Sequence, residues 1–320
     1  MDRRIQERRK AGPHAMKQEY IDTVRLLIDI APDVFASPRF AMKGGTAINL
    51  FVQDMPRLSV DIDVVFTDHT LARNDALQAM QSDLQAAAMT LEGRGLSVTL
   101  PKKPGGEDVK LFVRSDLAEV KIEVNHIFRG TLLPTKAMPL TPTAQDTFTA
   151  EIAVPMLNTA EIYGSKLVAA MDRQHPRDIF DVLKMYEKFG LDSAFVDCFV
   201  GHLAGHNRPV HEVLFSTDLP LESIYENHFR GMTSEEVSLA TLEQVRATMK
   251  NDLPKALTAK HKDFLLSLVR AEPAWDLMPF PHLKDLPALR WKLANLESLR
   301  AKKPDVFAQQ YTALKERLGT

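Results

Sequence analysis

Apolar and polar residues alternate with two different periods along the first part of the chain. Apolar positions between residues 18 and 30 follow the helical period, and they predict a helix that ends before Pro32. Residues 71–91, which are rich in Ala, Gln and Met, predict a second helix that ends at a pair of nearby glycines. Alternating or short apolar runs predict strands at residues 59–66, 96–100, 109–113 and 118–124.

The second half of the chain has a different pattern. Residues 127–157 contain many Pro and Thr and few helical signals, so we interpret them as connecting structure. From Thr159 onward, amphipathic helical patterns follow one another. This order predicts an α+β fold, with a mixed-sheet front domain and its N-terminal helix over residues 1–155 and an all-α domain over residues 156–320.

Composition restricts the class of protein without naming a function. The 320 residues carry a formal net charge of −2, so a nucleic-acid partner would need a local basic patch. The single cysteine, Cys198, excludes an internal disulfide and is interpreted as core packing. No window approaches the roughly 20 apolar residues of a membrane span. These features predict a soluble, cytoplasmic protein without membrane contact, and the charged residues 1–14 are interpreted as a solvated tail.

Two aspartates on one predicted strand are the first candidate chemistry. Asp61 and Asp63 lie two residues apart, so their side chains share one face of the strand, while Ile62 and Val64 face the core. Adjacent carboxylates repel unless a cation neutralises them. Mg²⁺ prefers oxygen ligands and commonly uses one or two carboxylates together with substrate phosphates. Asp61 and Asp63 are therefore candidate metal ligands and catalytic residues for a magnesium–nucleotide substrate.

A glycine turn precedes this strand and supplies a candidate phosphate site. Gly44 and Gly45 allow close backbone approach, and the helix that begins near Thr46 directs N–H groups and a positive dipole end toward an anion. With Lys43, these residues are the candidate nucleotide-binding segment. The alternative is an ordinary helix start after a tight turn, with two surface aspartates on an edge strand; the combination with Asp61 favours phosphate and metal binding.

A third carboxylate is expected from a neighbouring strand. Glu119, Lys121 and Glu123 share one face of the strand predicted at residues 118–124. Glu123 is the preferred third metal ligand because it falls late in the strand, and Glu119 is the second choice. Lys121 is either a local counter-ion or a solvated strand lysine.

A second motif lies on two consecutive predicted helices. Lys166 and Arg173 are seven residues apart and share a helix face, where two cations can meet phosphates. Pro176 fits the first position of the next helix, which places Asp178 in its first turn. The alternatives are helix-dipole complementation for Asp178, and for Asp181 a salt bridge to Arg177 or Lys184.

The remaining helices carry aromatic and basic residues that we interpret as structural. Trp275 and Trp291 are expected to anchor the core. Basic side chains, including Lys292, could contact an RNA backbone, but solvated helix faces are the preferred interpretation.

Several segments together resemble a known family. These are KGGTAINLF from Lys43, SVDIDVVF from Ser59, EVKIEVN from Glu119, RDIFD from Arg177 and PALRWKLANL from Pro287. They resemble the AbiEii/AbiGii-type nucleotidyltransferase toxins, relatives of the MenT toxins within the DNA polymerase β-like nucleotidyltransferase superfamily. The chain departs from the expected pattern at Val60, where an acidic or polar residue is usual; this affects no ligand.

The resemblance implies an enzyme, a toxin that uses an NTP to modify tRNA and has a cognate antitoxin as partner. It implies a polymerase β-like front domain, Mg²⁺ or Mn²⁺ as cofactor, metal binding by Asp61 and Asp63, and nucleotide contact or catalysis by Lys166 and Asp178. Two other hypotheses remain open. One is a nucleotidyltransferase acting on a small molecule or a protein, and the other is a non-catalytic nucleotide-binding module.

Overall fold

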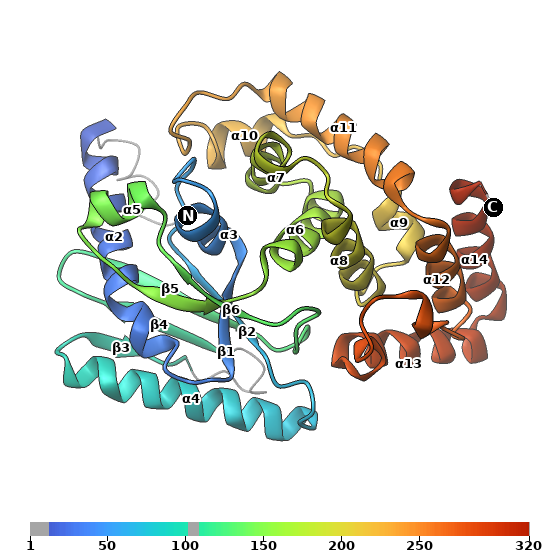
Figure 1. Cartoon of the computed structure of the whole chain (residues 1–320), viewed down its shortest axis with the longest axis horizontal. Coiled ribbons are helices and arrows are strands. Elements are labelled where there is room, and N and C mark those ends of the chain that lie inside the picture. The colour runs from blue at the N-terminus through green and yellow to red at the C-terminus, as the bar shows by residue number, and fades with distance from the viewer. Residues whose placement is uncertain (1–12, 102–108, 320) are drawn as a thin grey trace. The chain divides into compact units, whose positions relative to one another are not determined.

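The computed structural model describes residues 13–101 and 109–319 and contains two compact units (Figure 1). The first unit comprises Met1–Phe66, Leu71–His126 and Lys136–Met156, and the second comprises Thr67–Thr70, Ile127–Thr135 and Leu157–Thr320. The division that the sequence predicts at residues 155 and 156 lies next to the end of the first unit. The charged segment up to residue 12, and most of the turn between the strands predicted at 96–100 and 109–113, lie outside the described residues.

The first unit is built on a mixed sheet of seven strands among the described residues, in the order β3-β4-β5-β2-β1-β7-β6. Strand β2 pairs antiparallel with β1 and parallel with β5, whereas β1 pairs parallel with β7. The strands are β1 (Phe40–Lys43), β2 (Ile62–Phe66), β3 (Ser97–Thr99), β4 (Lys110–Arg114), β5 (Glu119–Asn125), β6 (Lys136–Pro139) and β7 (Ala153–Met156).

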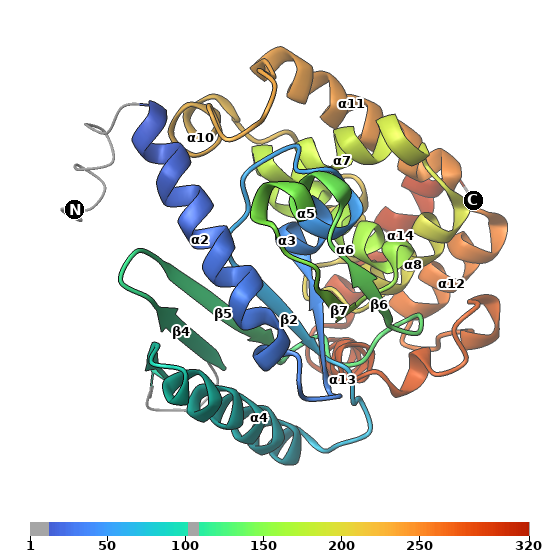
Figure 2. The same ribbon diagram turned by 60° about the vertical axis from the view of Figure 1, so that its left-hand side comes forward.

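Apolar and polar residues alternate along the strands, so that one face of the sheet forms the core of this unit and the other carries the candidate site residues. In β5, Val120, Ile122 and Val124 are at most 2% exposed, while the polar residues between them are partly exposed. Helices α2 (Pro13–Val34) and α4 (Arg73–Gly93) contact each other and the sheet, and they bury their apolar stripes there (Figures 1 and 2). The polar positions of β5 consequently lie on the face away from this core.

Two local expectations for the first unit are wrong. Pro32 does not end α2, which continues to Val34; a proline near the end of a helix removes few of its hydrogen bonds. Residues 127–157 are more than connecting structure, because they contain β6, α5 (Pro142–Phe148) and β7, and both strands join the sheet. Their Pro and Thr content conceals short strands whose pairing is decided by tertiary contacts.

The second unit is helical, as the sequence predicts. Helices α6 and α8 pack closely because Gly164 lacks a side chain: a Cβ at that position would lie 2.5 Å from the Cβ of Cys198. Cys198 is fully buried, which confirms its packing role. The helices are α6 (Thr159–Arg173), α7 (Pro176–Phe189), α8 (Ser193–Ala204), α9 (Val210–Leu214), α10 (Glu222–His228), α11 (Leu239–Ala256), α12 (Ala259–Val269), α13 (Pro287–Lys302) and α14 (Pro304–Leu318), with short 3-10 turns at Trp275–Leu277 and Leu283–Asp285.

Two side chains of α13 exchange the environments that the sequence suggests. Trp291, expected in the core, is 52% exposed, whereas Lys292, expected in solvent, is only 4% exposed. The orientation of α13 on its neighbours decides this, and one helix position separates an exposed face from a buried one. None of the described helices has the length and apolarity needed to cross a membrane.

Candidate functional site

The turn between β1 and the following helix places a glycine directly against Asp63. Lys43 pairs with Asp63 in the β1–β2 register, and Gly44 follows with φ +79°. A Cβ on Gly44 would lie 2.2 Å from Oδ2 of Asp63. Gly44 is therefore required both by its backbone conformation and by the carboxylate that occupies the adjacent space.

The second glycine faces two polar side chains that sequence reasoning did not select. A Cβ on Gly45 would lie 2.6 Å from Nη2 of Arg57 and 2.9 Å from Oγ of Ser59. Arg57 is 4% exposed, and its Nη1 donates to the carbonyl of Leu58. Both residues precede the aspartate pair in RLSVDID, where a basic and a hydroxyl residue beside two carboxylates could have indicated a shared site.

Thr46 connects the helix start to the strand that carries the aspartates. Its hydroxyl donates to the carbonyl oxygen of Asp61 at 2.5 Å and lies 3.0 Å from Oγ of Ser59. The helical segment continues from α3 (Gly44–Ala47) through a π-helical turn at Ile48–Val52. The hydroxyl that the sequence suggests for a phosphate is thus used within the protein, where it fixes the backbone of Asp61.

The candidate third carboxylate lies beside the pair and contacts two lysines. Glu123 pairs with Asp63 in the parallel β2–β5 register. Lys121 Nζ lies 3.1 Å from Oε2 of Glu123 and 3.9 Å from Oδ2 of Asp61, and Lys110 Nζ lies 3.5 Å from Oε1 of Glu123. Lys121 is therefore a local counter-ion, one of the two interpretations that the sequence left open.

These contacts shift the pKa values of both partners. Partial burial raises the pKa of Glu123, but the hydrogen bond and charge of Lys121, assisted by Lys110, hold it below its ordinary value. Burial lowers the pKa of Lys121, but Glu123, Asp61 and Asp63 raise it above its ordinary value. The two lysines consequently favour the ionised form of Glu123.

The carboxylates fit a divalent cation that also binds substrate. Among residues 13–101 and 109–319, no three His, Cys, Asp or Glu side chains are grouped so that they could hold a metal ion by themselves. Asp61 and Asp63 nevertheless provide two oxygen donors at one end of β2, and the Asp61 side chain is 49% exposed. Such a pair suits Mg²⁺, which keeps several waters and takes further ligands from substrate phosphates. Glu123 as a third ligand stays a prediction.

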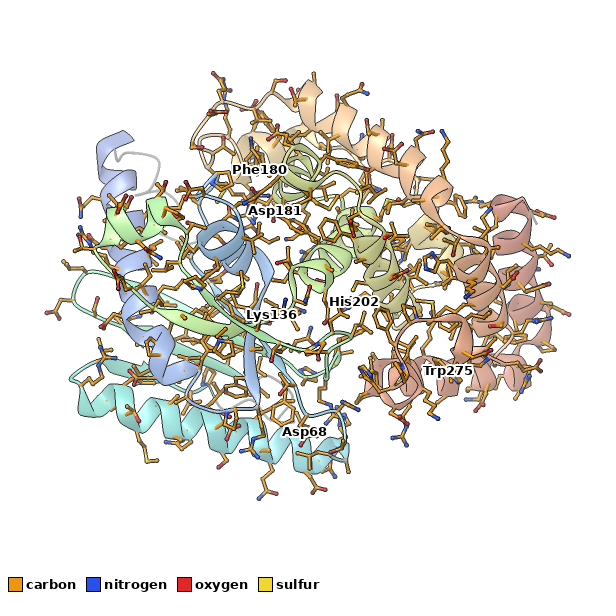
Figure 3. The ribbon with its side chains drawn as sticks, viewed as in Figure 1. Asp68, Lys136, Phe180, Asp181, His202 and Trp275 are labelled. Carbon is orange, nitrogen blue, oxygen red and sulfur yellow. The ribbon has the colours of Figure 1, made fainter. Side chains whose placement is uncertain are left out.

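The second unit holds a cluster of alternating charges on α6 and α7. Lys166 Nζ lies 2.9 Å from Oδ1 of Asp178 and 2.9 Å from Oδ2 of Asp181, and these three side chains are at most 8% exposed. Arg173 donates to Asp178 from Nε and Nη2 at 2.9 and 3.1 Å. Asp181, labelled in Figure 3, thus contacts Lys166, a partner on the preceding helix that its spacing did not suggest.

Side-chain caps at the starts of α6 and α7 hold the two helices that carry this cluster. Asn158 caps α6 through the N–H of Ala160, and Nδ1 of His175 accepts from the N–H of Arg177 at the start of α7. Burial and the charge of Arg177 lower the pKa of His175 to about 4, so its ring is a neutral acceptor at pH 7. Burial raises the pKa of Asp178, but Lys166 and Arg173 together lower it to about 2. The cations thus hold Asp178 firmly ionised.

Comparison with known proteins agrees with the sequence resemblance. Residues 25–295 match the family described as "Nucleotidyl transferase AbiEii toxin, Type IV TA system". No curated protein matches the chain. Among solved structures, MenT4, a nucleotidyltransferase toxin from Mycobacterium tuberculosis H37Rv, is similar with a TM-score of 0.54 and 18% identity. That match covers 85% of this chain and 93% of MenT4, and it shows a shared fold.

The family match covers most of the chain, including the glycine turn, both aspartates and the charged cluster of α6 and α7. The non-catalytic alternative is therefore not the one that these findings support, since the family consists of enzymes by its description. The chain belongs to the AbiEii family of nucleotidyltransferase toxins of type IV toxin–antitoxin systems.

Proposed function

We propose that this chain transfers a nucleotidyl group from an NTP to an RNA acceptor, tRNA, in the cytoplasm. An acceptor hydroxyl would attack the α-phosphorus, the bond to the β-phosphate oxygen would break, and pyrophosphate would leave. The observation that carries this proposal is the pair Asp61 and Asp63 at the glycine turn, with Gly44 packed against the Asp63 carboxylate.

In the first unit, Asp61 and Asp63 would hold Mg²⁺ or Mn²⁺, which when bound would neutralise charge on the triphosphate. Thr46 fixes Asp61 through its backbone carbonyl. Lys121 lies 3.9 Å from Asp61 and 3.1 Å from Glu123 and balances part of the charge of these carboxylates. The N–H groups that follow Lys43 and Gly44 remain the candidate phosphate donors.

In the second unit, Lys166, Arg173 and Asp178 are the proposed nucleotide-contacting and catalytic residues. Arg173 is the more available cation, since its side chain is 62% exposed whereas that of Lys166 is 8% exposed. We therefore assign the phosphate contact first to Arg173. Lys166 would act from within the cluster, oriented by Asp178 and Asp181.

The decisive experiment incubates purified protein with each labelled NTP, Mg²⁺ and total RNA. Asp61→Asn and Asp63→Asn should abolish labelling, because each removes a charge from the metal site while keeping nearly the same shape. Asp116→Asn is the matched control, an exposed aspartate of the same unit that should keep wild-type activity. Full labelling by either site variant would refute the metal assignment.

Growth assays separate the acceptor classes. Induced wild-type protein should arrest bacterial growth, Asp61→Asn should relieve the arrest, and co-expression of a cognate antitoxin should do the same. Labelled tRNA that disappears together with the arrest supports the proposal. Normal growth together with labelling of a small molecule or a protein would favour the alternative acceptor.

A further inference from the structure

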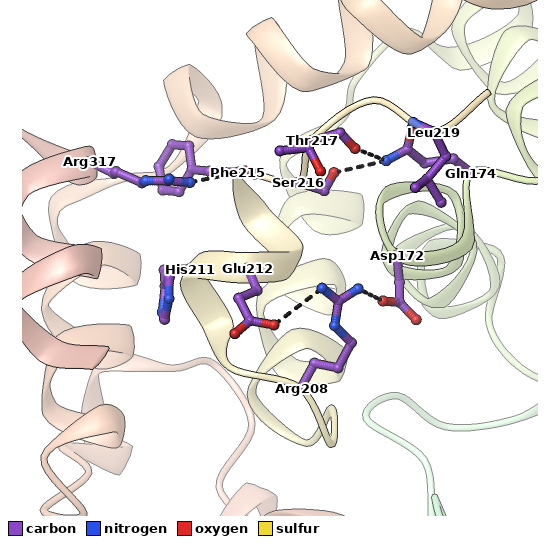
Figure 4. A pocket seen from close by; sticks show the side chains of 10 residues that line it. All are labelled: Asp172, Gln174, Arg208, His211, Glu212, Phe215, Ser216, Thr217, Leu219 and Arg317. Carbon is purple, nitrogen blue, oxygen red and sulfur yellow. Dashed lines mark hydrogen bonds and ion pairs between the residues drawn. The ribbon is translucent and has the colours of Figure 1, made fainter. Parts of the chain in front are cut away.

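The second unit contains a pocket of about 250 Å³ that is separate from the Lys166 cluster (Figure 4). It lies where the end of α6, helix α9 and the last turn of α14 meet, and Arg208, His211 and Arg317 are among its lining residues. None of the residues assigned above to nucleotide transfer lines it.

One arginine of the pocket is already neutralised. Arg208 Nη1 lies 2.6 Å from Oδ1 of Asp172, and its Nη2 lies 3.2 Å from Oε2 of Glu212. Figure 4 shows Arg208 between these two carboxylates, which also line the pocket. The three side chains form a bridge with a net charge of −1, in which neither carboxylate is without a partner.

The other arginine has no carboxylate partner among the described residues. Arg317 Nη1 donates to the carbonyl of Phe215 at 3.0 Å, and its guanidinium lies 5.7 Å from the centre of the Phe215 ring. These two contacts hold the guanidinium at the pocket and leave donors of its fork for a ligand. A fixed guanidinium with spare donors is a preferred partner for a phosphate.

A buried ammonium group contacts the backbone of Arg208, one of the residues that line the pocket. Lys292 is 4% exposed, and Nζ donates to the carbonyl of Arg208 at 2.7 Å. Within residues 13–101 and 109–319 it has no carboxylate within ion-pair distance, although buried charges are normally paired. Burial outweighs the attraction of Glu212 and lowers the pKa of Lys292 to about 8. When the positive charges of Arg317 and Lys292 are added, the formal net charge of this region rises from −1 to +1.

His211 adds a side chain that can respond to an anion. Burial lowers its pKa, Glu212 opposes this shift, and Arg317 and Lys292 lower the pKa further. The neutral ring therefore lies in the field of two cations, neither of which has a carboxylate within ion-pair distance among the described residues. An anion bound beside Arg317 would favour a proton on His211 and gain a second donor.

Hydrogen bonds of Gln174 hold another wall of the pocket in place. Gln174, 1% exposed, donates from Nε2 to the carbonyl of Thr217 at 2.6 Å and accepts from the N–H of Leu219 and from Nη1 of Arg246, each at 3.1 Å. These bonds fix the segment that follows α9, so the pocket is formed before any ligand binds.

We propose that this pocket binds a phosphate ester, one nucleotide unit of an RNA chain or a free nucleotide. Arg317 and His211 would hold the phosphate, under the field of Lys292. Asp172 and Glu212, each in an ion pair with Arg208, would accept hydrogen bonds from the sugar hydroxyls. The volume is below the roughly 300–1,000 Å³ of common ligand pockets, so the pocket would enclose one phosphate and its sugar while the base stays outside.

The test measures binding in the full chain carrying Asp61→Asn, without metal ions, so that transfer and metal-dependent NTP binding do not contribute. The probes are a fluorescein-labelled ten-nucleotide RNA, followed by anisotropy, and AMP, followed by calorimetry. Arg317→Gln should weaken binding at least about fivefold, since it removes a charge-assisted contact. Lys315→Gln, the same change in charge on the same helix turn, should alter Kd by less than about twofold.

Lys292→Met provides a second variant, which replaces the ammonium by an apolar chain of similar length and should weaken binding in the same direction. Dependence on Arg317 for RNA alone identifies a chain phosphate, and dependence for AMP as well identifies a free nucleotide. Equal losses in Arg317→Gln and Lys315→Gln, or no binding of either probe at millimolar concentration, would overturn the proposal. Because no transfer is measured, such a failure leaves the proposed reaction untouched.

Discussion

Replacing Lys166 by methionine tests whether the charged cluster of α6 and α7 is catalytic, structural or both. Lys166 Nζ is 2.9 Å from a carboxylate oxygen of each of Asp178 and Asp181, and these carboxylates are only 5% and 1% exposed. Methionine keeps the length of the side chain but leaves two buried carboxylates without this partner. A loss of activity could therefore arise from lost stability alone.

The structure gives the size of this effect. Burial raises the pKa of Asp178, but its cations bring it to about 2, against 3.8 in the unperturbed form, so the fold stabilises the ionised carboxylate by a net of about 2 kcal/mol. In the variant, Arg173 still stabilises the Asp178 carboxylate. Breaking a buried ion pair nevertheless typically costs about 3–5 kcal/mol. We expect Lys166→Met to lower the free energy of unfolding by about 3 kcal/mol. The free energy of unfolding of most proteins is about 5–15 kcal/mol, so the variant should still fold.

Charge compensation separates the two roles. The double variant Lys166→Met with Asp181→Asn leaves Arg173 and Asp178 as a neutral pair, and it should recover most of the lost stability in urea unfolding. If Lys166 assists the chemistry, both variants should label tRNA at least about tenfold more slowly, the factor that corresponds to about 1.4 kcal/mol. Full transfer by the double variant would make Lys166 structural. An unchanged unfolding free energy in the single variant would refute the reasoning from burial.

Three further predictions follow from single contacts. Gly44→Ala should destabilise the protein more than Gly95→Ala and should reduce transfer, since both glycines have positive φ but only at Gly44 would the Cβ meet a carboxylate, at 2.2 Å; equal losses in thermal unfolding would contradict this. Thr46→Val should cost about 1–3 kcal/mol and slow transfer because Asp61 loses its backbone anchor, whereas Thr46→Ser should keep both properties. The folded-state pKa of Asp178 lies below its unfolded value, so its contribution of about 2 kcal/mol is complete above pH 4 and disappears as the pH falls to about 2. Urea unfolding from pH 2 to 7 should show this loss in the wild type and not in Asp178→Asn.

The sequence by itself determined the order of elements and the face of each strand. Alternation in SVDIDVVF and EVKIEVN places Asp61, Asp63 and Glu123 opposite the apolar residues, and the β2–β5 register agrees. The start of α7 was equally readable, because Pro176 acts through local geometry alone. Local patterns carry this information since a period of two or 3.6 residues decides which side chains share a face.

Only the tertiary structure decided which charges meet. Asp181 has two basic residues at helical spacing, yet it pairs with Lys166 on the preceding helix. Trp291 and Lys292 are adjacent residues with long side chains, and the packing of α13 buries the lysine and exposes the tryptophan. Strands β6 and β7 form where composition suggested a connection, because their hydrogen bonds come from distant residues. The contacts of Gly44 with Asp63 and of Gly45 with Arg57 likewise depend on how strands and turns are brought together, which no local period encodes.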